Sequence, residues 1–169
     1  MKISKYTLAI ALTGVLAASA AYAATQSVTA NIKFDTPLSL TKNNDIQFGT
    51  VKARQAGTYV INTANNVTAS SGGVWLFGIP AAGSIAVTGS TTNTVTISTS
   101  GYTANNGVTP SAATCKYGAG MAVSCDSGIS GAAPGASTPL LVGVQVVADG
   151  TQAPGSTATP SFTVSVVYN

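Results

Sequence analysis

The sequence contains no histidine and no glutamate, so aspartate is its only acidic residue type. The four aspartates are far apart, and each lies beside an expected turn or strand end, where aspartate commonly makes local hydrogen bonds. They are Asp35, Asp45, Asp126 and Asp149. Without histidine a Ser-His-Asp triad is impossible, and acid–base catalysis has few groups to use. We therefore expect a protein that is not an enzyme.

Motifs that hold common cofactors are also absent. There is no GxxxxGK run to bind a phosphate and no D-x-D-x-D cluster to bind calcium. The two cysteines, Cys115 and Cys125, lack CxxC spacing, and no histidine is present to complete a metal site with them. We therefore expect no cofactor and no bound metal.

Charge is scarce as well, since charged residues make up only 7% of the chain. Residues 24–169 carry five basic and four acidic side chains, a net charge of +1. This charge is too small to attract nucleic acid. A surface rich in Thr, Ser, Asn and Gly is instead typical of secreted β-proteins, and it suits a protein that meets copies of itself.

The first 23 residues have the three-part pattern of a secretory signal peptide. Two lysines within residues 1–5 precede an apolar run over residues 6–16, and small residues follow up to Ala21-Tyr22-Ala23, an A-x-A cleavage site. The apolar run is too short to span a bilayer, and we expect no transmembrane segment in the mature chain. We predict cleavage after Ala23 and export through the inner membrane. In an exported chain, Cys115 and Cys125 are expected to form one disulfide.

The rest of the chain is a series of short alternating apolar runs separated by Gly, Asn, Pro and Ser, with no helical periodicity. The strongest internal run covers residues 140–147. The last run, residues 161–169, has four apolar side chains at every second position: Phe162, Val164, Val166 and Tyr168. The pattern predicts an all-β fold, a sandwich of about eight to ten short antiparallel strands.

Another clear alternation follows the predicted cleavage site directly, over residues 25–34. Its apolar positions are Val28, Ala30, Ile32 and Phe34, with polar residues between them. We therefore divide the mature chain into an N-terminal strand, residues 24–36, and a β-sandwich domain, residues 37–169.

A few aromatic residues are candidates for ligand contact. Trp75 and Phe77 belong to the continuous apolar run 74–77, which fits a strand buried on both faces or one edge of a pocket, and we interpret both as packing residues. Tyr102 and Tyr117 lie in loop-like contexts and are better candidates for contact with a ligand such as a glycan.

Several short motifs resemble, in order, a family of bacterial secreted domains of unknown function, numbered 4402. The first are PLSLT at residues 37–41 and DIQFGTV at residues 45–51, followed by Gly57. The later ones are Val87-Thr88-Gly89, LVGV at residues 141–144 and the closing FTVSVVYN. The G-x-Y-x-G that usually precedes the last strand of this family is replaced by GSTATP at residues 155–160.

That family in turn resembles the subunits of chaperone–usher pili and the related spore-coat-like pilins. Those subunits end in a strand with a penultimate tyrosine and have a glycine about fourteen residues before the end, and Tyr168 and Gly155 match both positions. Their fold is an immunoglobulin-like sandwich that lacks one strand, and the N-terminal extension of the next subunit fills the gap. The cysteine pair departs from the pattern, because pilins place their disulfide near the start of the domain.

The resemblance implies a subunit of a surface fibre that assembles by exchanging strands with copies of itself. Val28, Ala30, Ile32 and Phe34 would be donor residues, and Gly155 and the last strand would form the acceptor. A periplasmic chaperone and an outer-membrane usher would be further partners, and the fibre would lie between the periplasm and the exterior of a Gram-negative bacterium. The alternative is a self-complete sandwich whose residues 25–34 pair within their own chain and whose Tyr102 and Tyr117 bind a ligand. The sequence leaves both open.

Overall fold

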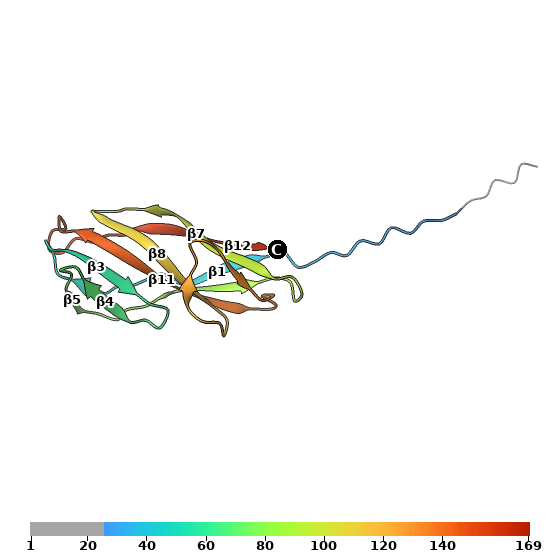
Figure 1. The fold of residues 1–169 in the computed structure, drawn as a ribbon, viewed down its shortest axis with the longest axis horizontal. Helices are drawn as coiled ribbons and strands as arrows, with labels where there is room; N and C mark the ends of the chain where they lie inside the picture. The colour runs from blue at the N-terminus through green and yellow to red at the C-terminus, as the bar shows by residue number, and fades with distance from the viewer. Residues whose placement is uncertain (1–25) are drawn as a thin grey trace, which may run out of the picture. The chain divides into compact units, whose positions relative to one another are not determined.

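The structure, a computed structural model, describes residues 26–169, so the predicted signal peptide lies outside the described residues. The chain divides into two units, Met1–Lys33 and Phe34–Asn169. In the first unit, residues 26–33 form no strand and are exposed. All strands of the described residues belong to the second unit (Figure 1).

The second unit is entirely β, as the alternating pattern predicts. Residues 26–169 contain twelve strands and no helix. The strands are β1 (Ser39–Asn44), β2 (Thr50–Val51), β3 (Ala56–Ile61), β4 (Val67–Ser70), β5 (Trp75–Phe77), β6 (Gly83–Thr88), β7 (Val95–Thr103), β8 (Val108–Tyr117), β9 (Val123–Ser124), β10 (Ile129–Gly131), β11 (Thr138–Asp149) and β12 (Ser161–Tyr168).

The larger sheet is built around β11, and all its pairings are antiparallel. The first half of β11 pairs with β6 and the second half with β3, while β8 pairs along the opposite edge. The strand order is β1-β6-β11-β3-β4, with β9 beside β8. β11 has neighbours on both edges, and its alternate residues Leu140, Val142, Val144 and Val146 are buried, whereas Val147 and Asp149 are exposed.

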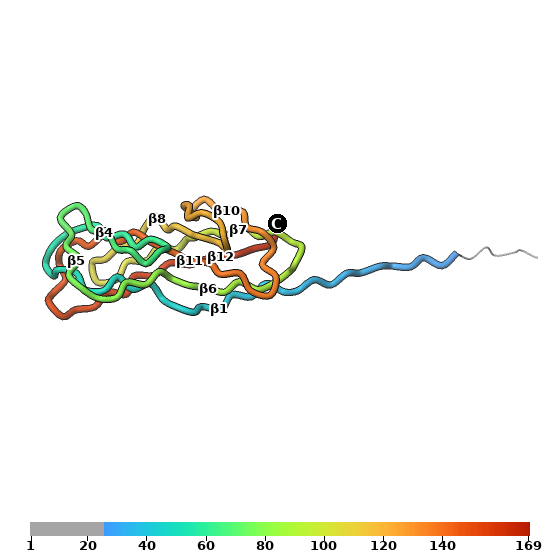
Figure 2. Tube along the Cα trace, turned by 90° about the horizontal axis from the view of Figure 1, so that it is seen from below, coloured from blue at the N-terminus to red at the C-terminus, as the bar shows by residue number. Residues whose placement is uncertain are grey.

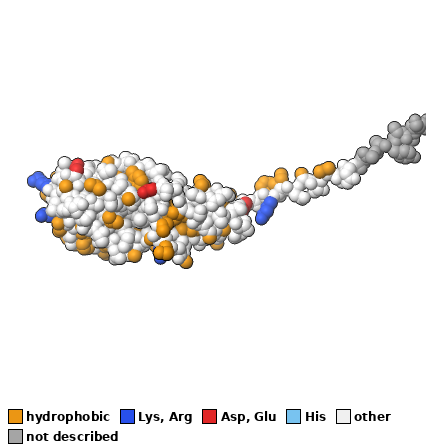
Figure 3. All heavy atoms as spheres, viewed as in Figure 1, with side chains coloured by type: hydrophobic (Ala, Val, Ile, Leu, Met, Phe, Trp, Pro, Cys, Tyr) orange, Lys and Arg blue, Asp and Glu red, His pale blue; other side chains and the backbone are white. Residues whose placement is uncertain are grey.

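A second sheet, with the order β10-β7-β12, packs against the larger one, and β2 and β5 form a separate two-stranded ribbon (Figure 2). The core lies between the two sheets. Val95 and Ile97 of β7 and Val166 of β12 are buried in one cluster with alternate residues of β11: Leu140, Val142, Val144 and Val146. The predicted β-sandwich is therefore confirmed. Around it, the visible surface is mostly polar and uncharged (Figure 3).

Two local expectations differ from the structure. Tyr102, expected in a loop-like context, instead lies in β7, which continues to Thr103, and β8 begins at Val108 after a turn over residues 104–107. The apolar run 74–77 is not a strand buried on both faces: β5 pairs only with β2, and Phe77 is 64% exposed. Residues 26–36 form no strand in the single chain, and their expected strand stays a prediction.

We predict that Gly143→Ala weakens the fold at its central strand. A Cβ at residue 143 would meet the Ile61 carbonyl oxygen and lie 2.8 Å from Thr114 Oγ1, because β11 is paired on both edges there. Overpacking of this kind lowers the free energy of unfolding by about 1–3 kcal/mol. Urea denaturation measures the effect. The exposed Thr109→Ala of β8 is the control, and equal midpoints for both variants would contradict the prediction.

Candidate functional site

Each sheet has an edge strand with one free edge. β1 pairs only with β6, and β12 pairs only with β7. Among residues 26–169, no backbone–backbone hydrogen bond joins the other edge of either strand to a neighbour. Such an edge offers its N–H and C=O groups to an added strand.

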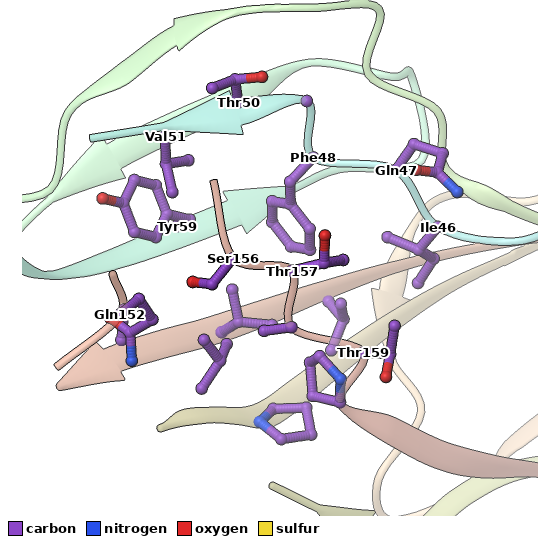
Figure 4. A pocket seen from close by; sticks show the side chains of 18 of the residues that line it. Ile46, Gln47, Phe48, Thr50, Val51, Tyr59, Gln152, Ser156, Thr157 and Thr159 are labelled. Atoms are coloured by element: carbon purple, nitrogen blue, oxygen red, sulfur yellow. The ribbon is translucent and has the colours of Figure 1, made fainter. Parts of the chain in front are cut away.

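A groove of about 860 Å³ lies beside the start of β12 (Figure 4). Residues 45–53, which follow β1, line one side, and residues 152–153 and 155–162, which lead into and begin β12, line another. Strands β3, β8 and β11 contribute the remaining lining residues: Tyr59, Val108, Pro110, Val144, Val146 and Ala148.

The lining is largely apolar on the side of the sandwich core. Ile46, Phe48 and Val51 come from the segment after β1, and in Figure 4 Phe48 points toward Ser156 and Thr157. Trp75 of β5 fixes this wall, because its Nε1 donates a hydrogen bond of 2.7 Å to the Phe48 carbonyl oxygen. The interpretation of Trp75 as a packing residue agrees with this contact. The groove therefore suits apolar side chains presented by an extended chain.

The segment before β12 is held by the turn between β7 and β8. Asn106 Nδ2 donates to the Thr157 carbonyl oxygen at 3.1 Å, and the Thr159 backbone N–H donates to Asn105 Oδ1 at 2.9 Å. Gly155 lies in this segment and has a φ of +80°, a backbone conformation that favours glycine. A side chain at this position would meet no nearby atom, so lack of room is not the reason for the glycine.

The C-terminal end of β12 is joined to the segment that precedes β1. Tyr168 Oη accepts a hydrogen bond of 2.6 Å from the buried Ser90 N–H and donates one of 2.8 Å to the Thr36 carbonyl oxygen. The neighbouring Asp35 carboxylate accepts from Ser90 Oγ at 2.7 Å and from Asn93 Nδ2 at 2.5 Å. Tyr168 and Asp35 therefore fix where the chain enters the domain.

The expected donor residues present apolar side chains to solvent in the single chain. Val28, Ile32 and Phe34 are 91%, 75% and 89% exposed, and Ala30 is exposed as well. Burying one such large side chain stabilises a complex by about 1.5–3 kcal/mol. This exposure is a substantial driving force for association.

The expected acceptor residues occupy different parts of the site. Gly155 and Phe162 line the groove, whereas Val164, Val166 and Tyr168 pack against the core, with Val166 buried. Sequence reasoning missed the side chains that the core strands and the segment after β1 bring to the groove: Ile46, Phe48, Val51, Tyr59, Val144 and Val146. The only signal for the first three is the DIQFGTV motif.

Tyr102 and Tyr117, the candidates for ligand contact, lie in β7 and β8 and not in loops. The Tyr102 ring stacks on Phe162 with centroids 5.4 Å apart, and its hydroxyl accepts a hydrogen bond of 3.0 Å from the Ala113 N–H. Tyr117 is buried, and its hydroxyl donates to the Ala132 carbonyl oxygen at 3.2 Å. Burial raises the pKa of both hydroxyls. Both rings are thus part of the packing.

The predicted disulfide is present, with Cys115 and Cys125 fully buried and their Cα atoms 5.6 Å apart. Asp126 follows directly, and its carboxylate accepts hydrogen bonds from Thr99 Oγ1 at 2.6 Å and from the Tyr102 hydroxyl. Burial by itself would raise the pKa of Asp126, but these hydrogen bonds outweigh it and hold the pKa below its ordinary value of 3.8.

Two further findings concern residues 26–169 only. No three His, Cys, Asp or Glu side chains in this range lie close enough together to hold a metal ion. No helix in this range could cross a membrane.

We predict that Tyr168→Phe loosens the C-terminal end of β12. The variant leaves the buried Ser90 N–H and the Thr36 carbonyl oxygen without this partner, which costs about 1–3 kcal/mol. Urea denaturation measures the loss, and faster hydrogen exchange at the Ser90 amide locates it. The exposed Val167→Thr on the same strand is the control, and unchanged Ser90 exchange would refute the assignment.

We also predict a pH dependence from Asp126. Because its pKa is lower in the folded chain than in the unfolded one, its contribution to stability is present above the unfolded pKa and is lost as pH falls through the folded pKa. As the pH is lowered below about 5, the free energy of unfolding should fall less in Asp126→Asn than in the unsubstituted chain. Parallel curves would contradict the role of Asp126. Asp149, whose pKa is also lowered, is present in both chains and so does not contribute to the difference between their curves.

Comparison with curated proteins and with solved structures gives no match. A family profile, Domain of unknown function (DUF4402), matches residues 38–168. This range runs from the residue before β1 to the end of β12, so it contains every described strand and the whole groove. The chain therefore belongs to the DUF4402 family.

Proposed function

We propose that this domain binds an extended β-strand donated by a second copy of the same chain, and that the protein is a non-enzymatic structural subunit of a surface fibre. One observation carries the proposal. A groove that is apolar on its core side lies beside the start of β12, a strand with one unpaired edge, in a chain whose residues 26–34 present apolar side chains at alternate positions.

The chemistry of the groove matches such a strand. A strand laid along β12 would form main-chain hydrogen bonds with its free edge and turn every second side chain toward the core. Val28, Ala30, Ile32 and Phe34 would then face Phe48, Phe162 and the side chains of β11. Burial of the three large donor residues, at about 1.5–3 kcal/mol each, has to exceed the cost of ordering the segment.

A second copy is a better donor than the chain itself. Asp35 and Thr36 are held to the domain through Ser90, Asn93 and Tyr168. Pro37 keeps Thr36 in an extended conformation, which opposes a reversal of the chain there. To fill its own groove, the segment would have to reverse at these residues and give up their hydrogen bonds, whereas donation to another copy requires no such change.

Donation from each copy to the next is a head-to-tail contact, which forms open filaments when the rotation does not close a ring. The signal-peptide pattern supports export from the cell, and the resemblance to chaperone–usher pilins supports a periplasmic chaperone and an outer-membrane usher as assembly partners in a Gram-negative bacterium. The alternative of glycan binding through Tyr102 and Tyr117 has less support, because both hydroxyls are engaged within the domain.

We predict that Ile32→Asp in the chain without residues 1–23 abolishes assembly, because it would place a charge in the apolar groove. The unsubstituted chain should give fibres by electron microscopy and a ladder that resists denaturant in gels. Asn31→Asp is the matched control, since it adds the same charge on the opposite face of the donor strand and should still assemble.

The same Ile32→Asp chain should remain able to accept a strand. A synthetic peptide of residues 25–34 should bind it, and the peptide with Ile32→Asp should not. Fibres of normal yield from Ile32→Asp, or failure of the unsubstituted peptide to bind, would overturn the proposal.

A further inference from the structure

A stacked pair of aromatic rings connects the groove to the disulfide. Phe162, the second residue of β12, lines the groove, and the Tyr102 ring of β7 stacks on it with an interplanar angle of 30°. An offset aromatic stack is worth about 0.5–1.5 kcal/mol beyond the area it buries. The position of Tyr102 therefore restricts where the Phe162 ring can lie.

Three polar contacts fix Tyr102 in turn. Its hydroxyl donates to the Asp126 carboxylate, accepts from the Ala113 N–H at 3.0 Å, and lies 3.2 Å from Thr99 Oγ1. The same Asp126 oxygen also accepts from Thr99 Oγ1 at 2.6 Å. A hydrogen bond to a charged acceptor is about twice as strong as a neutral one, so Asp126 is the principal anchor of this ring.

The disulfide holds Asp126 at the position where its carboxylate binds the Tyr102 hydroxyl. Asp126 follows Cys125, which lies ten residues after Cys115 of β8, and between the end of β8 at Tyr117 and Cys125 this excursion forms only the two-residue β9. The Cys125 N–H donates to the Ala113 carbonyl oxygen at 3.2 Å, and its own carbonyl oxygen accepts from the Thr99 N–H at 3.1 Å. Without the disulfide, these two contacts, the short β9 and the hydrogen bonds of Asp126 to Thr99 and Tyr102 would have to hold the excursion.

We infer that the Cys115–Cys125 disulfide, acting through Asp126 and Tyr102, positions the Phe162 ring in the groove and so sets the affinity for the donated strand. The inference rests on the proposed strand-accepting function and assigns positioning roles to residues that do not touch the donor. A purely structural disulfide would change the stability of the domain and leave the affinity of the groove unchanged.

The test uses the Ile32→Asp chain, without residues 1–23, as the acceptor and a fluorescent peptide of residues 25–34 as the probe. Tyr102→Phe keeps the stacked ring and removes its hydroxyl, and it should weaken peptide binding about five- to tenfold. Asp126→Ala and Cys115→Ala/Cys125→Ala should weaken it at least as much. Tyr117→Phe is the matched control: it removes a tyrosine hydroxyl bound to Ala132 outside the groove, and binding should be unchanged.

A double-mutant cycle distinguishes positioning from general loosening. If Tyr102 acts through Phe162, Tyr102→Phe should have no further effect on binding in a Phe162→Ala background. Equal binding by the unsubstituted acceptor and Tyr102→Phe, or additive effects in the cycle, would overturn the inference while leaving the strand-accepting function in place. No peptide binding by any acceptor would instead reject the proposed function, and this inference with it. Because Tyr102→Phe retains the disulfide, the test holds even if the double cysteine variant does not fold.

Discussion

The free edge of β12 is the constraint on which the rest of the domain depends. A strand that is half-buried in a sandwich and paired on one edge only has polar backbone groups beside an apolar core. Native proteins usually cover such an edge or blunt it with charge. Here the strand carries no charged side chain, and the adjacent groove is apolar where it meets the core. The edge is therefore suited to pairing with an added strand, as the proposed function requires.

A different tyrosine holds each end of β12, one through hydrogen bonds and the other through a stacked ring. At the C-terminal end, Tyr168 joins the strand to Ser90 and Thr36. At the start, Tyr102 stacks on Phe162 and is held by Asp126 beside the disulfide. An acceptor strand has to keep its register and its position relative to the core before the donor arrives, since ordering it during binding would reduce affinity. Both contacts would serve that purpose in the proposed complex.

The fold follows from the sequence where one physical signal dominates. Period-two alternation predicts β11 and β12, and the even number of cysteines, together with the predicted export signal, predicts the disulfide. The signal fails where a turn residue lies inside a strand: Gly101 suggests a loop, although pairing with β12 continues β7 to Thr103, whereas Asn105 and Gly107 lie in the turn between β7 and β8. The groove is harder still to predict from the sequence. It is lined by residues from 45–53 and from 152–162, which share no sequence pattern and come together only in the folded chain.

The attachment of Asp35 and Thr36 to the domain has a mechanical consequence. No flexible spacer separates Phe34, the last donor residue, from the hydrogen bonds to Ser90 and Tyr168. When such a segment lies in the groove of a neighbour, a pull along the filament passes directly from one β12 to the next domain. The hydrogen bonds of a strand lying along the pull are loaded together and not one by one. Such a filament would resist tension along its length and have little freedom to bend between subunits.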